Sequence, residues 1–348
     1  MFIITNRNLL PEATGLWKFG NRLSEAGCNE IRVAEAQYIR GEWELKIFDD
    51  EWGPKYRQTT HPECEFASEY VARRVLQDAQ TGKKNIVFMI HGFNNNLEAA
   101  LNRAHSIEVR YGVTVVIFSW PANGGGRGLA SYHSDKRDAR ASAGALERTI
   151  EKAHDYFVKF NKQESERIKA VAADRYPEQS EARIQQVVQL LRQHCQIKIT
   201  LLCHSMGNYL YKQVLKSTAS AGNPLLFDNV LLVAADANND RHSEWVDLIR
   251  FRNRLYITIN EDDEALALSR MKHGDLQLAR LGQFTRKLDS QNARYIDFTG
   301  HTSRLASHCY FDDADEYVKS KLFFGRALNG EVAEDVMRYD PSSNLYRL

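Results

Sequence analysis

Six stretches of the chain are almost continuously apolar over four to seven residues. Polar residues rarely interrupt them, which indicates strands that are buried on both faces, as in a parallel sheet. Segments with apolar residues at helical spacing lie between most of these stretches. Strands that alternate with helices predict an α/β fold built on a doubly wound, mostly parallel sheet. The apolar stretches are 86–90, 113–118, 197–203, 230–235, 255–259 and 295–298, and the helical segments are 97–110, 130–160, 206–219 and 241–250.

The chain ahead of this alternation is more polar. Residues 2–5, 31–39 and 43–48 predict early strands in polar surroundings. Residues 66–80 have the spacing of a helix, and we expect it to stop at Thr81-Gly82, because glycine is common just after a last helical turn.

The connection between 113–118 and 197–203 is longer than a compact α/β unit needs. It holds the helical segment 130–160, a charge-rich stretch from 162 to 175 that is typical of a solvated helix face, and a second helical pattern at 180–194. We interpret 157–183 as a helical insertion between core strands, and its apolar residues among many charges favour a lid or cap over the site. A helical hairpin that lies away from the site is the alternative. The whole chain, 1–348, is then one domain with this insertion.

The composition favours a globular protein and argues against a nucleic-acid-binding or membrane protein. Apolar residues make up 43% and charged residues 26%, which is ordinary for a globular domain. Lys plus Arg is 46 and Asp plus Glu is 45, so a net charge of +1 argues against a nucleic-acid partner. No run approaches the roughly 18 apolar residues of a membrane helix, so we expect no integral membrane segment. The absence of a secretory signal pattern and five cysteines without a C-x-x-C pair favour a cytoplasmic protein with reduced thiols.

The strongest chemical signal is the segment Leu201–Asn208, LLCHSMGN. A buried strand ends here and a helix begins, with Ser205 at the corner, as in a nucleophile elbow. The tight turn needs small residues two positions before and two after the serine, and Gly207 meets that need. Cys203 stands where glycine is most common, but its side chain is small as well. The alternative is that Ser205 simply caps an ordinary helix.

A second loop fits the same chemistry. Residues His91-Gly92-Phe93-Asn94 follow the apolar run 86–90. In enzymes with a nucleophile elbow, the loop after this strand supplies one backbone N–H to the oxyanion hole, and the residue after the serine, here Met206, supplies the other. We therefore expect the amides of Phe93 and Met206 to bind the oxyanion. For His91 we favour a structural hydrogen bond within the loop over proton transfer.

The acid of a catalytic triad follows the serine in chain order and the histidine comes last. The acidic segment 261–264 follows the run 255–259, although carboxylates there also suit the start of a helix. Asp236, after 230–235, is a rival position for the acid. For the base, His301 and His308 both lie in the expected loop after 295–298.

These segments together resemble the α/β-hydrolase superfamily, and more narrowly a bacterial group of uncharacterised α/β-hydrolases with serine-esterase or lipase-like elbows. The resemblance implies Ser205 as nucleophile, Asp263 as orienting acid and His308 as base, since the acid of that family precedes x-Ala-Leu. The segments that carry it are Ile4–Arg7, Ile90–Asn94, Phe118–Pro121, His204–Asn208, Asp263–Leu266 with Ser269, and Ser307–Tyr310, in the expected order over about residues 2–325.

We therefore expect a serine hydrolase that cleaves a carboxylic ester through an acyl-enzyme, without a cofactor or a metal ion. The expected partner is a small-molecule or lipid ester as substrate. An acyltransferase, a thioesterase or a lipase uses the same triad and stays an alternative. A non-catalytic α/β-hydrolase scaffold that binds a protein partner is the alternative outside enzymes.

Overall fold

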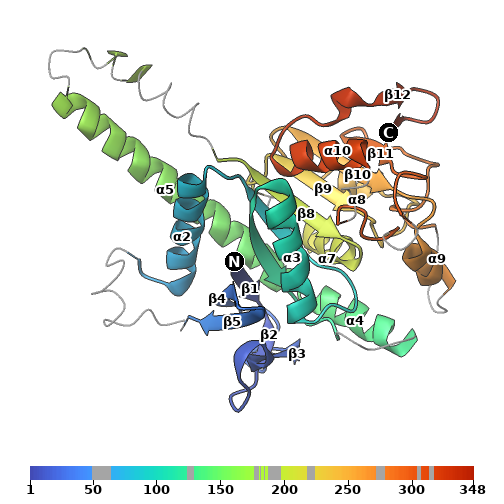
Figure 1. The fold of residues 1–348 in the computed structure, drawn as a ribbon, viewed down its shortest axis with the longest axis horizontal. Helices are drawn as coiled ribbons and strands as arrows, with labels where there is room; N and C mark the ends of the chain where they lie inside the picture. Colours follow the sequence, from blue (N-terminus) through green and yellow to red (C-terminus); the bar gives the residue numbers. More distant parts are fainter. Residues whose placement is uncertain are drawn as a thin grey trace.

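The computed structural model describes residues 1–48, 64–123, 129–175, 180, 182–183, 185–186, 197–217, 224–271, 279–303, 307–312 and 317–348. Within these residues an eleven-stranded sheet runs through the molecule in the order β12-β13-β11-β10-β9-β8-β6-β7-β1-β4-β5 (Figure 1). Its strands are β1 (Phe2–Thr5), β4 (Arg32–Ile39), β5 (Glu42–Ile47), β6 (Ile86–Ile90), β7 (Thr114–Ser119), β8 (Ile199–His204), β9 (Asn229–Val233), β10 (Arg254–Ile259), β11 (Ala293–Asp297), β12 (Arg338–Asp340) and β13 (Leu345–Arg347).

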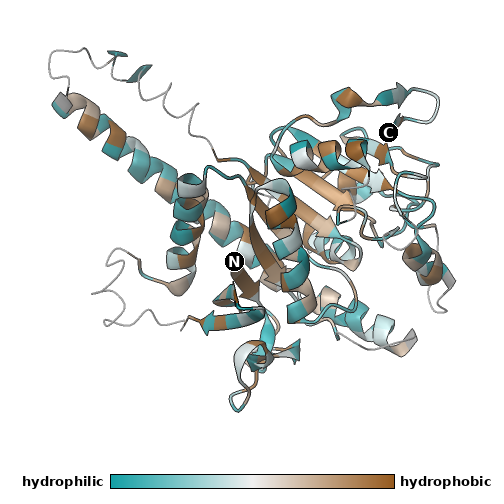
Figure 2. Cartoon of the chain, viewed as in Figure 1, coloured by the Kyte–Doolittle hydropathy of each residue, from teal (hydrophilic) through white to brown (hydrophobic). Residues whose placement is uncertain are grey.

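Neighbouring strands are parallel from β1 across to β13, and β4, β5 and β12 extend the two edges in antiparallel pairs. The prediction of a doubly wound, mostly parallel sheet is confirmed. The six continuously apolar stretches coincide with β6 to β11, because each of these strands is covered on both faces. Figure 2 shows these strands as the apolar centre of the molecule, with hydrophilic residues on the outer surfaces of the helices.

Successive residues of the central strands contribute to two separate cores. Phe88 and Ile90 pack in one core, whereas Val87 and Met89 pack in the other. The first core contains residues of α2 (Ala67–Gly82), α4 (Leu129–Ala141), α5 (Ala143–Arg175), α7 (Met206–Ser217) and α8 (Ser243–Val246). The second contains residues of α3 (Leu97–Tyr111), α9 (Glu264–Met271) and α10 (Val318–Leu328).

The segment predicted as one helix over 130–160 forms two helices. A turn at Ser142 separates α4 from α5. Ser142 is buried, its hydroxyl donates to Asp138 O at 2.7 Å, and Asn6 Nδ2 donates to that hydroxyl at 2.9 Å. A contact with the residue between β1 (Phe2–Thr5) and β2 (Arg7–Leu9) therefore fixes the break, and the helical periodicity does not reveal it.

Helix α5 continues through the predicted insertion as far as Arg175 and extends well beyond the rest of the fold (Figure 1). Phe157 lines an apolar cavity between α2, α5 and the sheet, and no described residue of 157–175 lines the pocket at Ser205. Most of 176–183 and of the predicted helix 180–194 lies outside the described residues. The lid over 157–183 stays a prediction.

Other differences concern short elements. The helix predicted over 241–250 is shortened to α8, because Leu248 N bonds Trp245 O and Ile249 N bonds Val246 O, which is three-residue spacing rather than four. The pair β2 (Arg7–Leu9) and β3 (Phe19–Leu23), the edge strand β12 and its neighbour β13 are only three to five residues long, too short for an apolar pattern to predict them. Among the helices that the structure describes, none is long and apolar enough to cross a membrane.

Candidate active site

The candidate site lies where the order of the strands reverses. The chain passes from β6 to β7 on one side, and then returns to place β8 on the other side of β6. In open α/β sheets, the loops at the carboxyl ends of the strands form the binding crevice at such a point. The loops after β6, β8, β10 and β11 carry the side chains that the sequence analysis singled out.

Ser205 occupies a sharp turn between β8 and α7. Its φ of 53° lies in the left-handed region, which is uncommon for a residue with a side chain. Ser205 N donates to Val233 O at 3.0 Å, and Asp236 N donates to Ser205 O at 3.2 Å. The N–H of Ser205 is therefore bonded to the end of β9 and its C=O to the loop that follows β9, and these bonds hold the strained conformation in place.

Asn208 reinforces this turn from within the first turn of α7. Its side-chain Nδ2 donates to Cys203 O at 3.0 Å, to Ser205 O at 3.1 Å and to Val233 O at 3.1 Å. Asn208 belongs to the motif LLCHSMGN, but the motif alone predicts no role for it. A polar side chain at the start of an otherwise apolar, buried helix is the signal that could have identified it.

Two glycines allow the loops after β6 and β8 to approach each other. A Cβ on Gly207 would lie 2.6 Å from Ile90 O, and a Cβ on Gly92 would lie 2.7 Å from Ser205 Cβ. Cys203 has no comparable restriction, because its side chain packs in the core on the α7 side of the sheet. The structure thus accommodates cysteine where the elbow motif usually has glycine.

We expect Gly92→Ala to lower kcat/KM for an aryl ester by about 100-fold, because displacements of about 1 Å at a reacting centre have effects of that size. The added methyl group would also lie 3.3 Å from Ser205 Oγ, so the serine and the loop must separate. The matched control is Gly325→Ala in α10, where the nearest atom to the new Cβ is 4.0 Å away. Equal activity of the two variants, measured on folded protein, would show that the close approach has no catalytic importance.

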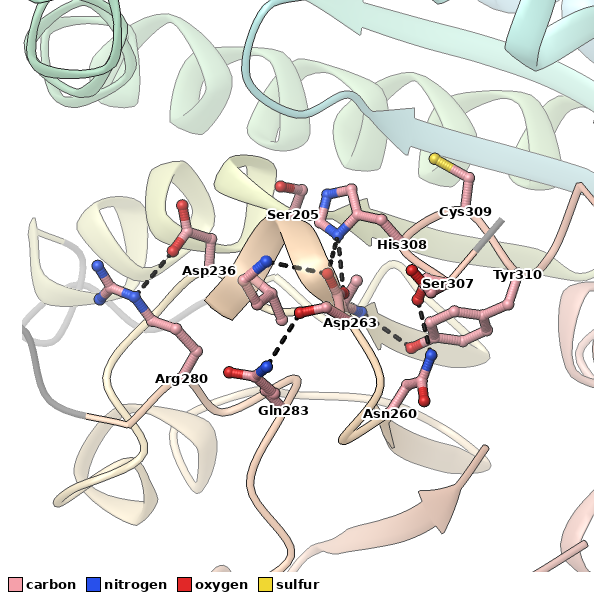
Figure 3. A network of polar contacts seen from close by, with 12 residues as sticks. Ser205, Asp236, Asn260, Asp263, Arg280, Gln283, Ser307, His308, Cys309 and Tyr310 are labelled. Atoms are coloured by element: carbon pink, nitrogen blue, oxygen red, sulfur yellow. Dashed lines mark hydrogen bonds and ion pairs between the residues drawn. The ribbon is translucent and has the colours of Figure 1, made fainter. Parts of the chain in front are cut away.

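His308 and Asp263 are joined directly. His308 Nδ1 lies 2.7 Å from Asp263 Oδ2 and 3.0 Å from Asp263 Oδ1. Asp263 is fully buried after β10, and its Oδ1 also accepts from Leu266 N at 2.9 Å at the start of α9. Figure 3 shows the imidazole between this carboxylate and Ser205. When Nδ1–H donates to a carboxylate, the other ring nitrogen, Nε2, is left without a proton and can accept one from the serine.

Contacts between loops hold His308 in this position. Buried His204 bonds through Nε2 to His308 O at 3.0 Å, and burial lowers the pKa of His204 well below its ordinary value. Asn260 Nδ2 donates to Ser307 O at 2.7 Å, which ties the end of β10 to the histidine loop. Gln283 Nε2 donates to Asp263 O at 2.9 Å. None of these three supporting side chains stands out in the sequence pattern.

Ser205 and His308 line the same pocket. In the described part of the chain no hydrogen bond joins Ser205 Oγ to His308 Nε2. Catalytic hydrogen bonds are often long without substrate and shorten in the reacting complex. His301 lies elsewhere: its N donates to Phe298 O and its O accepts from Ser320 Oγ, and it does not line this pocket.

Asp236, the rival acid, has different partners. Arg280 Nε lies 3.0 Å from Asp236 Oδ1, and both side chains are almost completely buried. Ser269 Oγ donates to Oδ1 at 2.8 Å and Tyr132 OH donates to Oδ2 at 2.9 Å. Figure 3 shows Asp236 directed toward Arg280, apart from the contact between Asp263 and His308.

The loop after β6 is held by two buried ionic side chains. Arg7 Nη2 donates to Asn95 O at 3.0 Å and its Nε donates to Ser119 Oγ at 2.9 Å, while Asp135 accepts from Asn94 N at 3.1 Å. Burial lowers the pKa of Arg7 to about 9. The two residues attach this loop to the amino-terminal strands and to α4.

Of the predicted oxyanion residues, Phe93 lies in this loop and lines the pocket, and Met206 is the first residue of α7. Backbone N–H groups in the first turn of a helix have no acceptor within that helix. His91 is fully buried and stacks on Trp120 with ring centroids 5.3 Å apart. Burial and the nearby Arg7 lower the pKa of His91 to about 3, and His91 Nδ1 lies 3.0 Å from Gly92 O within the loop.

The pocket at Ser205 has a volume of about 310 Å³, near the lower end of the range for small-molecule sites of about 300–1,000 Å³. In the part of the chain that the structure describes, no group of three or more His, Cys, Asp or Glu side chains is arranged to hold a metal ion. The pocket is lined by Phe93, Asn94, Asn95, Arg103, Tyr132, His204, Ser205, Asp236, Ala265, Leu266, Ser269, His308 and Cys309.

Comparison with known proteins agrees with this architecture. The model of one protein family, described as alpha/beta hydrolase of unknown function (DUF900), matches residues 67–172 and 165–319. These ranges cover more than half of the chain and include the loops after β6, β8, β10 and β11. No curated protein and no solved structure matches the sequence significantly.

Proposed function

The chain belongs to this family of alpha/beta hydrolases, and from that premise we propose that it is a serine hydrolase that cleaves carboxylic esters through an acyl-enzyme. The observation that carries the proposal is the bond between His308 Nδ1 and buried Asp263 beside a serine with a φ of 53°. A helix cap would explain Ser205 alone, but it would not require a buried carboxylate on a histidine in the same pocket.

In the proposed reaction, Ser205 Oγ attacks the ester carbonyl while His308 Nε2 takes its proton. Asp263 holds the imidazole in the useful tautomer and stabilises the imidazolium that forms. The alcohol leaves with that proton, and an acyl-serine remains. Water then attacks the acyl-serine with His308 as base, which releases the carboxylic acid and restores the serine.

The developing negative charge on the carbonyl oxygen is stabilised by the backbone N–H groups of Phe93 and Met206. Such groups contribute most when they are already oriented before the reaction begins. Arg7 and Asp135 fix the loop that carries Phe93, and the helix α7 fixes Met206. We assign the oxyanion to the two N–H groups of Phe93 and Met206 because the loop and the helix that carry them are held in place before substrate binds.

The direct test is covalent labelling with a fluorophosphonate, which reacts with an activated serine. We expect one molecule of probe per chain, attached to Ser205 and identified by mass spectrometry of the peptide. Asp263→Asn should slow the labelling strongly, because it weakens the activation of the serine. Heat-denatured protein is the control for non-specific reaction. A folded protein that is not labelled, or is labelled equally at other serines, would contradict the proposed activity.

A further inference from the structure

Arg103 is a cation in the pocket at Ser205, and among the described residues it has a carboxylate partner at Nε only. Arg103 on α3 lines the pocket, and its Nε donates to Asp312 Oδ2 at 3.1 Å. Within the described residues no carboxylate or carbonyl oxygen accepts a hydrogen bond from its two terminal nitrogens. The guanidinium is thus anchored at one edge and available at the other.

The surroundings of Arg103 favour a fixed position rather than a solvated one. Its side chain is only 22% exposed, and the guanidinium lies 6.0 Å from the centroid of the Phe311 ring. Cys309, next to His308, is close enough to interact with it. An arginine that is already ordered loses less rotamer freedom when it binds a ligand than one that is free in solvent.

The carboxylates at and next to the pocket are already paired. Asp236 on the pocket wall is paired with Arg280 at 3.0 Å, and Asp263 behind His308 is bonded to that histidine at 2.7 Å. The remaining lining combines amide and hydroxyl side chains from Asn94, Asn95, Tyr132 and Ser269 with the apolar Phe93, Ala265 and Leu266. A long alkyl chain in this pocket would leave several of the polar groups facing hydrocarbon.

From these contacts we infer that the enzyme acts on a small ester that carries a carboxylate, and that Arg103 is the specificity-determining residue that binds this group. The two terminal nitrogens of a guanidinium match the two oxygens of a carboxylate in a bidentate pair. The inference rests on the proposed function, because it assigns a substrate class to the same serine site.

The test compares esters of similar size, one of which carries a carboxylate while the other does not. One pair carries the charge on the acyl group: the 4-nitrophenyl monoester of succinate and 4-nitrophenyl pentanoate. The other pair carries it on the alcohol: 3-acetoxybenzoate and phenyl acetate. Arg103 can bind a carboxylate on only one side of the ester bond, so we expect the effect in one of the two pairs. In that pair the anionic ester should have a kcat/KM 10- to 100-fold higher than the neutral ester, mostly through a lower KM. This matches about 1.5–3 kcal/mol for a hydrogen bond to a charged group.

Arg103→Gln should bring the ratio of kcat/KM for the anionic and neutral esters close to one. Arg103→Lys should leave an intermediate ratio, because lysine keeps the charge but lacks the two parallel N–H donors of a guanidinium. The matched control is Arg110→Gln on the same helix, which removes the same charge from a side chain that does not line the pocket. It should keep the wild-type ratio. Free succinate should inhibit the wild type competitively, and Arg103→Gln should weaken that inhibition about 10-fold or more.

The comparison of anionic and neutral esters in the wild type needs no variant, so it tests the preference for a carboxylate even if Arg103→Gln does not fold. Equal kcat/KM for the anionic and neutral esters in both pairs overturns the inference. A ratio that persists in Arg103→Gln also overturns it. Hydrolysis of a neutral ester with labelling of Ser205 would then still support the serine hydrolase, whereas absence of both would overturn the proposed function itself.

Discussion

Ser205→Ala is expected to lower the turnover of an aryl ester by about 10⁴-fold or more, because a triad cannot form the acyl-enzyme without its nucleophile. The fold should survive the change. Ser205 Oγ makes no hydrogen bond within the described residues, and alanine is no more restricted than serine at a φ of 53°. The measurement is kcat with 4-nitrophenyl acetate, together with a thermal unfolding curve.

The control for this prediction is Ser217→Ala at the other end of α7. Its hydroxyl donates to Val214 O at 2.8 Å and is remote from the pocket. We expect its turnover to equal that of the wild type within about twofold, as for surface changes in general. If the Ser205→Ala protein is folded and keeps wild-type turnover, Ser205 is not the nucleophile.

Asp263→Asn should lower kcat by about 10⁴-fold, because an amide no longer holds His308 in the tautomer that accepts the proton of the serine. The change keeps the size of the side chain, and its oxygen retains the acceptor for Leu266 N. The neighbouring variant Asp262→Asn is the matched control. Asp262 is exposed and its Oδ2 accepts only from Gly300 N among the contacts of the described chain, so turnover should stay near that of the wild type.

Asp236→Asn separates the two positions for the acid. It leaves Arg280 buried beside an uncharged partner, and breaking a buried pair in this way costs about 3–5 kcal/mol of stability. We therefore expect a lower melting temperature than for Asp263→Asn, and a smaller loss of kcat in the protein that remains folded. A larger loss of kcat from Asp236→Asn, with Asp263→Asn still active, would assign the triad acid to the loop after β9.

Much of the sheet could be predicted because its physical cause is local in the sequence. A strand such as β6, Ile86–Ile90, must be apolar at every position when helices cover both faces. The short strands β12 and β13 have no such requirement, since β12 forms the edge of the sheet, β13 lies next to it, and most of their residues are exposed or half-buried. The break at Ser142 depends on a contact with Asn6, 136 residues away in the sequence, which periodicity does not report.

The sequence by itself determined the α/β architecture, the turn at Ser205 and the two loops that carry the acid and the histidine. It determined them because each has a signal in the sequence: buried strands are continuously apolar, a tight turn needs small residues, and the triad residues follow one another in a known chain order. The resemblance to a family, rather than any pattern, selected Asp263 and His308 from their rivals. Only the tertiary structure decided that Asp263 contacts His308 while Asp236 is paired with Arg280. It also decided that Gly92 must lack a side chain and that Arg103 faces the pocket, because these depend on segments far apart in the chain that meet only after folding.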